Sequence, residues 1–292
     1  ALQQALAGID GEVFAAGAEF PSVTITLARA AAASSGRLAT RWISPPAARV
    51  TPDAVAAALV PAVTALVVSH VDFRSGYRAD LAALREVLGP DRLLIVDAVQ
   101  SCGVVDEDWS AADVVVGHAY KWLRAGRGTG FARFTAHARD RIRPVLSGRV
   151  GTAAEGLPTD TLPEPAASAQ AFAVSGPDPL AAARLAVAVQ ESRSTGIAGI
   201  AARLSERVDD VLRIADRHGV PVLSPRERER RAGIVVLVPA DPARLGARLD
   251  AAGVTVTVRA GAVRVSPHAG TTAETLDMLD AALAEAREFI GR

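Results

Sequence analysis

Short apolar runs alternate along the first half of the chain with stretches that have helical periodicity. The runs occupy residues 12–16, 38–44, 64–70, 92–98, 113–117 and 130–134. Three of them are continuous and rich in Val, Ile and Leu, which is typical of strands buried on both faces of a mostly parallel sheet. We therefore predict a strand at each run.

The stretches between these strands carry residues that begin and end helices. Thr51 and Pro52 suit an N-cap and the first helical position, and segment 78–89 ends at Gly89, a residue that favours a helix C-cap. Strands that alternate with helices predict an α/β fold with layers of helices around the sheet.

The second half of the chain has a different order of elements. We predict helices at 179–190, 197–219, 241–253 and from about Thr272, and strands at 233–238, 254–259 and 262–267. This order indicates a smaller α+β domain over residues 196–292, after a large α/β domain over residues 1–195. The Pro- and Ala-rich segment 152–170 is expected to form a loop.

Composition excludes several classes of protein. The chain has 292 residues, is 50% hydrophobic and has a formal net charge of zero, so nothing favours nucleic acid as a partner. Cys102 is the only cysteine, which excludes a disulfide framework and a thiolate metal site. We also expect no metal. No apolar run reaches the ~18 residues of a membrane span, and no signal peptide is visible, so we expect a cytoplasmic protein.

Lys121, in "GHAYKWLRAG", is the only lysine, and every other Lys or Arg position holds arginine. Arginine serves any site that needs only a charge, but a guanidinium stays protonated and cannot act as a nucleophile. A lysine amine can lose its proton and react. One lysine could also escape an arginine bias by chance, so its neighbours have to decide.

Several polar residues follow the ends of predicted strands near this lysine. Asp97 ends one run and Lys121 follows the next. The others are His70, Asp72, Gln100, His118 and Tyr120. Ligands of open α/β sheets bind beyond the carboxyl ends of the strands, so we expect these side chains to share one crevice.

Taken singly, Asp97 could be a helix cap and Tyr120 a core residue. The segment 124–130 lacks a Gly-Lys-Ser/Thr ending and predicts a tight turn, not a phosphate loop.

An amine and a carboxylate, with further hydrogen-bonding groups, suit pyridoxal phosphate. A lysine holds the aldehyde of this cofactor as a Schiff base, and a carboxylate keeps the ring nitrogen protonated so that the ring accepts electrons. The sequence therefore indicates a pyridoxal-phosphate site at Lys121.

The chain resembles the class V aminotransferase family, which also contains kynureninase and the cysteine desulfurases. The matching segments are "SHVDFRSG" (69–76), "VDAVQS" (96–101), "HAYKWL" (118–123), "GRGTGF" (126–131) and "RVSPH" (264–268). The resemblance runs over nearly the whole chain. It implies the type I fold of pyridoxal-phosphate-dependent transferases and a homodimer with its site near the subunit interface.

The resemblance also implies roles for single residues. Lys121 would hold the cofactor and move the α-proton of the substrate, and Asp97 would pair with the pyridine nitrogen. Gln100 would donate to the ring oxygen, and His118 and Tyr120 would bind the phosphate. His70 and Asp72 would line the cofactor pocket. Arg264 would bind the substrate α-carboxylate with its planar fork.

The expected activity is a class V aminotransferase acting on an amino acid and a 2-oxo acid. A β-eliminating lyase of the kynureninase type, a cofactor-free Schiff-base aldolase and an inactive binding relative remain as alternatives. The family's N-terminal segment, which grips the phosphate, has no counterpart in the sequence, and this favours the last of them. Cysteine desulfurases carry a reactive cysteine well after the lysine, and Cys102 precedes it, so desulfuration is not expected.

Overall fold

The chain folds into two units, each with its own sheet, in a computed structural model that describes residues 1–154 and 160–290. The first unit comprises residues 1–70, 79–102 and 107–189, and the second comprises residues 71–78, 103–106 and 190–292. Each unit is described by itself below. The predicted division into domains at residues 195 and 196 stays a prediction.

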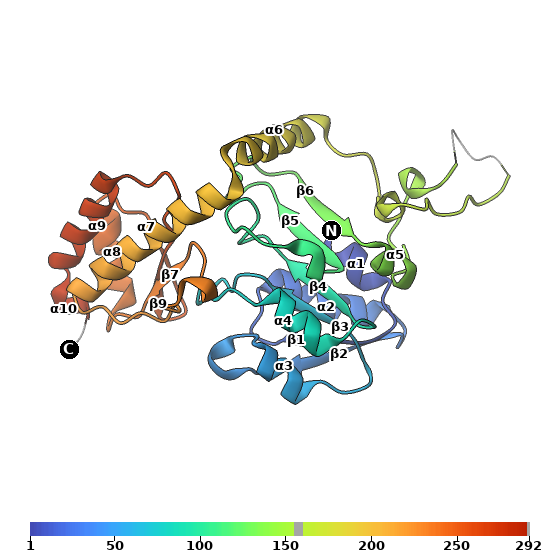
Figure 1. Cartoon of the computed structure of the whole chain (residues 1–292), viewed down its shortest axis with the longest axis horizontal. Coiled ribbons are helices and arrows are strands. Elements are labelled where there is room, and N and C mark those ends of the chain that lie inside the picture. Colours follow the sequence, from blue (N-terminus) through green and yellow to red (C-terminus); the bar gives the residue numbers. More distant parts are fainter. Residues whose placement is uncertain (155–159, 291–292) are drawn as a thin grey trace. The chain divides into compact units, whose positions relative to one another are not determined.

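The first unit is built on a six-stranded sheet with the order β2-β1-β3-β4-β5-β6 (Figure 1). Its strands are β1 (Gly11–Ala16), β2 (Leu38–Ile43), β3 (Val63–Ser69), β4 (Leu93–Asp97), β5 (Val114–His118) and β6 (Gly130–Phe134). The first five pair in parallel, and β6 runs antiparallel to β5. The predicted strands are therefore confirmed, and their predicted and observed bounds differ by no more than one residue.

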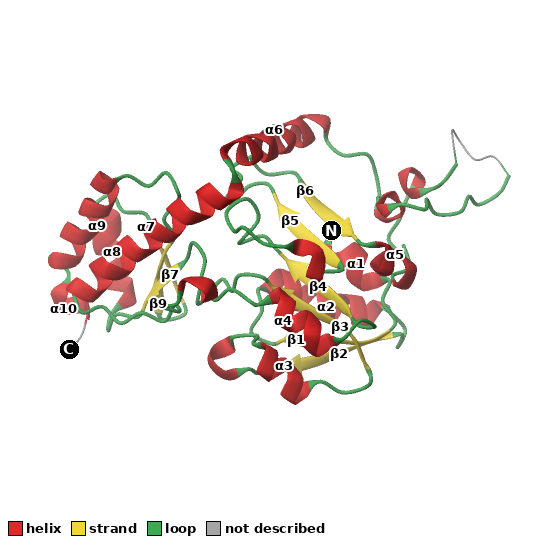
Figure 2. Ribbon diagram, in the orientation of Figure 1, coloured by secondary structure: helices red, strands yellow, loops and turns green. Residues whose placement is uncertain are grey.

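Helices cover both faces of this sheet (Figure 2). They are α1 (Leu2–Ala7), α2 (Pro21–Ala33), α3 (Pro52–Ala58), α4 (Leu81–Leu88) and α5 (Ala136–Arg141). A further helix, α6 (Pro179–Thr195), is largely exposed and runs into the second unit. The Thr51 hydroxyl accepts from the backbone N–H of Ala54, so the predicted N-cap is confirmed. Gly89 has φ +72° after α4, which confirms the predicted C-cap.

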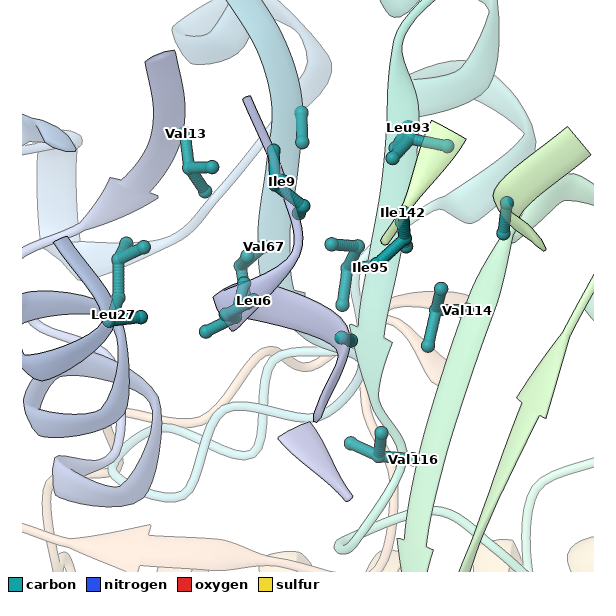
Figure 3. Packing of buried hydrophobic residues seen from close by; sticks show 14 of the residues in the cluster. Leu6, Ile9, Val13, Leu27, Val67, Leu93, Ile95, Val114, Val116 and Ile142 are labelled. Carbon is teal, nitrogen blue, oxygen red and sulfur yellow. The ribbon is translucent and has the colours of Figure 1, made fainter. Parts of the chain in front are cut away.

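Side chains alternate between the two faces of the strands and fill a core on each side. On one face, Val13, Val67, Ile95 and Val114 pack against the helices α1, α2 and α5, where Leu6 contributes (Figure 3). On the other face, α4 buries Leu81, Leu84 and Leu88. Burial on both faces explains why the strand sequences are continuous apolar runs.

The second unit contains a three-stranded antiparallel sheet with the order β7-β9-β8. Its elements are α7 (Ile197–Arg217), β7 (Val235–Leu237), α8 (Pro242–Ala251), β8 (Thr257–Arg259), β9 (Ala262–Val265), α9 (Ala273–Ala284) and α10 (Arg287–Ile290). The apolar face of α7 is buried at Val208, Val211 and Leu212, against a core that includes Leu237 and Leu279. The predicted α+β composition is confirmed.

Short 3₁₀ turns complete the chain, at Pro46–Ala48, Trp109–Ala111, Arg149–Gly151, Ala169–Phe172 and Arg228–Arg230. The predicted loop at 152–170 lies partly outside the described residues, and its described part ends in the turn that begins at Ala169. Among the described residues, no helix is both long enough and apolar enough to cross a membrane.

Candidate active site

Backbone hydrogen bonds continue between β3, β4 and β5 beyond the last residues of these strands. The Ala98 N–H donates to the Val116 carbonyl at 2.8 Å, and the His70 N–H donates to the Asp97 carbonyl at 2.9 Å. Asp97 is therefore fixed between the ends of three neighbouring strands, β3, β4 and β5, at the edge where ligands of such sheets bind.

The Asp97 side chain is buried, with 8% of the residue exposed. The N–H of Val99 donates to its Oδ1 at 2.9 Å. Burial raises the pKa of the carboxyl, while the Val99 N–H and the positive charge of Lys121 lower it. The structure thus brings Asp97 and Lys121 within electrostatic range of each other, as the sequence predicted from two successive strand ends.

Lys121 lies in the loop that follows β5. The loop is anchored at both sides of the lysine, because the indole N–H of Trp122 donates to the Gln100 carbonyl at 2.8 Å and the Arg124 N–H donates to the Lys121 carbonyl at 3.0 Å. Arg124 and Gly126 have left-handed φ values of +52° and +79°. This backbone confirms the predicted tight turn. The hydrogen bonds on both sides of Lys121 fix the position of its backbone.

Two residues that the sequence pattern did not single out complete this edge. The Phe20 ring lies beside Lys121, with the lysine Nζ 5.6 Å from the ring centroid. The buried Glu19 carboxylate accepts the Ser69 N–H at 2.9 Å and also binds the Ser69 hydroxyl, so it joins the end of β1 to the end of β3. The strand order reverses between these two strands, the point at which open sheets bind ligands.

His118, Tyr120 and Arg127 form a second group beside the lysine. The rings of His118 and Tyr120 meet edge to face, with centroids 4.4 Å apart, and the Arg127 guanidinium lies 4.5 Å from the centre of the Tyr120 ring. Partial burial lowers the pKa of His118, and the charges of Lys121 and Arg127 lower it further. His118 Nδ1 is buried and has no hydrogen-bond partner among residues 1–154 and 160–290.

His70 and Asp72 are engaged in local structure. The His70 ring is fully buried, with Nε2 3.0 Å from Glu107 Oε2 and its centroid 5.1 Å from that of Trp109. Asp72 belongs to the second unit, and its Oδ1 accepts from the N–H groups of Arg74 and Ser75 and from the Ser75 hydroxyl. These contacts account for both side chains structurally, so their role in a cofactor pocket stays a prediction.

Arg264 lies on β9 of the second unit. The flanking Val263 and Val265 are buried in the core of that unit, and Arg264 points to the opposite side of the strand, because successive side chains of a strand alternate between its faces. Its Nη1 donates to the Phe73 carbonyl at 3.4 Å, and burial, followed by the charge of Arg259, lowers its pKa. Its role as the carboxylate anchor stays a prediction.

The residues of the first unit fit pyridoxal phosphate on three counts. Among the residues that the structure describes, no cation donates a hydrogen bond to the buried Asp97 carboxylate, and a pyridinium nitrogen would be such a donor. Phe20 offers a flat ring beside the Lys121 amine, where a planar group bound to that amine would stack. The unpaired Nδ1 of His118 and the charge of Arg127 suit a phosphate.

No family model matches the chain. A curated relative, "Probable hercynylcysteine sulfoxide lyase" of Mycobacterium tuberculosis (strain CDC 1551 / Oshkosh), is 31% identical over 209 residues. The alignment covers 66% of this chain and 49% of the relative, so the chain spans about half the length of that protein.

Solved structures share the fold over almost the entire chain. The apo cysteine desulfurase of Thermococcus onnurineus NA1 matches with a TM-score of 0.81 at 20% identity, over 99% of this chain and 76% of that one. The cystine C-S lyase C-DES, in complex with its product cysteine persulfide, matches with a TM-score of 0.85 at 21% identity, over 97% and 78%. A C-DES mutant with glycine covalently linked to its PLP cofactor matches equally well, at 20% identity.

The chain therefore has the type I fold of pyridoxal-phosphate-dependent enzymes. Its resemblance to the group that holds the class V aminotransferases and the cysteine desulfurases is confirmed in the fold. The open sheet excludes the eightfold barrel expected of a cofactor-free Schiff-base aldolase. The curated relative and the solved structures named above are lyases and a desulfurase.

Proposed function

We propose that the protein is a pyridoxal-phosphate-dependent lyase that breaks the C–S bond of a sulfur-bearing amino acid. The observation that carries this proposal is that the sole lysine lies within electrostatic range of the buried Asp97 at the carboxyl edge of the sheet. The substrate class follows from the curated relative, a probable sulfoxide lyase, and from the C-S lyase with the same fold.

The residues of the chain have separable tasks in such a reaction. When bound, pyridoxal phosphate supplies a ring that accepts electrons from the substrate Cα. Lys121 would hold the cofactor through its amine, and the same amine would be the base that moves the α-proton of the substrate. Asp97 pairs with the ring nitrogen and keeps it protonated, and Phe20 holds the ring plane from one side. His118, Tyr120 and Arg127 hold the phosphate.

The only cysteine in the sequence does not suit the persulfide chemistry of a desulfurase. Cys102 is half-buried, and burial raises the pKa of its thiol to about 11. The thiolate is the nucleophile in such chemistry, so this thiol is protonated and unreactive at neutral pH. Breakage of the C–S bond without transfer of sulfur to the protein is therefore the better reading.

Transamination remains the second candidate, because it shares the lysine, the carboxylate and the cofactor with elimination. The two reactions differ in what leaves the substrate: a lyase releases ammonia and a 2-oxo acid, whereas an aminotransferase passes the amino group to an added 2-oxo acid. The remaining roles, for Gln100, His70, Asp72 and Arg264, and the homodimer are kept as predictions within the proposal.

Borohydride reduction of the protein with added pyridoxal phosphate tests the cofactor site. We expect one stable label, and peptide mapping should find it at Lys121. Lys121→Arg should lose the label and the visible absorption band, and activity should fall by about 1000-fold or more because a guanidinium cannot replace the amine. Arg124→Lys is the matched control: it adds a second lysine to the same loop and should leave the label on Lys121.

Product analysis then separates the two reactions. With cysteine, cystine and S-substituted cysteine sulfoxides, we expect ammonia and pyruvate to form without an added 2-oxo acid. A product that forms only when a 2-oxo acid is present would make the protein an aminotransferase. Absence of any label on Lys121 would reject both readings.

A further inference from the structure

Helix α6 meets the loop that carries Lys121 at two glycine residues. A β-carbon at Gly128 would lie 3.8 Å from the β-carbon of Ala181, and a β-carbon at Gly126 would lie 3.6 Å from Nε of Arg184. Ala181 and Arg184 are three residues apart, so they lie on the same face of the helix. All of these residues belong to the first unit. The face of α6 that covers the loop therefore includes an arginine.

The polarity of α6 is the reverse of that of a helix that only covers a core. The apolar side chains of Leu180 and Val187 are 73% and 56% exposed, whereas Arg184 lies over the backbone of the loop. A surface helix normally turns its apolar side chains toward the protein and its charged side chains toward the solvent. Packing alone does not explain why an arginine occupies the position next to Gly126.

Arg184 is an accessible cation without a partner. The residue is exposed, and within residues 1–154 and 160–290 its guanidinium has no hydrogen bond or ion pair. Arg127 follows Gly126 directly, lies against the Tyr120 ring and has no carboxylate partner in the described part of the chain. Two guanidinium groups thus lie at one short segment without an anion between them. An anion bound at this segment would relieve their mutual repulsion.

We propose that Arg184 holds the phosphate of pyridoxal phosphate together with Arg127, an inference that rests on the proposed cofactor site. The phosphate carries about two negative charges at neutral pH, so a single guanidinium compensates only part of its charge. A guanidinium also presents parallel N–H donors that match two phosphate oxygens. Arg127 supplies one such group from the loop of Lys121, and Arg184 supplies the other from α6.

Spectral titration of the full chain with pyridoxal phosphate and with pyridoxal, which lacks the phosphate, tests this role. Arg184→Gln should weaken the binding of pyridoxal phosphate by about tenfold, because one charged contact to the phosphate is lost. The affinity for pyridoxal should change by less than about twofold, because pyridoxal makes no such contact. Glutamine suits a helix almost as well as arginine does, so the fold should be retained.

Arg193→Gln is the matched control. Arg193 is an exposed arginine of the same helix, about two and a half turns further along and therefore on the opposite face. This substitution removes the same charge from α6 and should leave both affinities unchanged. A loss in Arg193→Gln equal to that in Arg184→Gln would mean that only the overall charge of the helix matters, which would overturn the inference.

Two further results would also overturn it. Equal losses for pyridoxal phosphate and pyridoxal in Arg184→Gln would show that the arginine supports the loop and does not hold the phosphate. Unchanged affinity for both compounds would make Arg184 a solvated surface residue. These results require a wild type that binds the cofactor at Lys121. A wild type that binds neither compound would instead reject the proposed cofactor site, and this inference with it, so the two failures are distinguishable.

Discussion

Two buried aspartates lie at opposite edges of the sheet in the first unit. One has the surroundings of a residue that stabilises the fold, and the other has those expected of a residue that takes part in a reaction. Asp97 ends β4, at the carboxyl edge, and Asp113 immediately precedes β5, at the amino edge. Both are 8% exposed, so burial alone does not distinguish them. What differs is the set of groups around each carboxylate.

The Asp113 carboxylate is surrounded by permanent partners. Its Oδ2 binds the Arg85 guanidinium and accepts the Leu94 N–H at 2.7 Å. Arg85 in turn donates to the carbonyls of Ala111, Gly89 and Arg92. This network ties α4 to the strands, and it leaves neither charge unpaired.

The Asp97 carboxylate accepts one hydrogen bond from the residues that the structure describes, that of the Val99 N–H, and burial raises its pKa. An isolated buried carboxylate is unfavourable for folding and persists where a function requires it. The comparison indicates that, of two equally buried carboxylates, the one that no guanidinium binds is the better candidate for a role in the reaction. It also gives opposite expectations for the two positions.

The largest effect is expected at Asp97. Asp97→Asn should reduce turnover on the order of 100-fold, because an amide cannot keep the pyridine nitrogen protonated and the ring loses its capacity to accept electrons. Cofactor labelling at Lys121 should persist. Steady-state turnover and labelling, compared in the same preparation, check this. Turnover equal to that of the wild type would remove Asp97 from the site.

Asp113→Asn should act on stability and leave the reaction unchanged. Removal of one partner of a mostly buried ion pair leaves the other charge uncompensated, and we expect a loss of about 2–3 kcal/mol in the free energy of unfolding. The loss stays moderate because Arg85 keeps its backbone carbonyls. Urea unfolding and turnover of the folded protein measure the two effects. A stable but inactive Asp113→Asn protein would show that Asp113 affects the reaction and not the fold, contrary to the distinction drawn between Asp97 and Asp113.

Most of the first unit could be predicted from local patterns. β3, β4 and β5 are buried on both faces and therefore leave continuous apolar runs, and the strand ends mark where Asp97 and Lys121 lie. The sole lysine in an arginine-rich chain singled out Lys121 as the candidate for the reactive position, because a guanidinium cannot act as a nucleophile.

The remaining site residues depend on contacts that no local pattern encodes. Glu19 and Phe20 precede α2, and their importance follows from Ser69 and Lys121, which are distant in sequence. A polar residue after a strand end, followed by a helix with Pro21 at its start, is the signal that could have found them. Segments 71–78 and 103–106 belong to the second unit through tertiary contacts alone.

A smaller effect is expected from the arginines of the two edges. Arg127 lies against Tyr120 at the carboxyl edge, whereas Arg133 donates to the carbonyls of Trp109 and Ala112 at the amino edge. Arg127→Gln should weaken pyridoxal phosphate by about tenfold, through the loss of one charged contact to the phosphate. Arg133→Gln should leave that affinity unchanged. Equal losses in a spectral titration of both variants would remove Arg127 from the phosphate site.

The smallest and most specific effect is the pH dependence that Asp97 gives to the cofactor-free chain. Burial raises the pKa of Asp97 above 3.8, so the folded state keeps a proton that the unfolded state loses as the pH rises. The carboxyl therefore has no net effect below the unfolded pKa, and it destabilises the fold progressively as the pH rises from there through the folded pKa. Asparagine carries no such proton, so Asp97→Asn should become more stable relative to the wild type over this range.

Urea unfolding of both proteins from about pH 4 to about pH 8 measures this difference, and Asp113→Asn is the control. Bound pyridoxal phosphate should reverse the trend, because a pyridinium partner favours the ionised carboxylate and lowers its pKa. The wild type would then gain stability relative to Asp97→Asn as the pH rises. If the stability difference between the wild type and Asp97→Asn does not depend on pH, with or without the cofactor, the Asp97 carboxyl is solvated. The contrast drawn here between Asp97 and Asp113 would then be wrong.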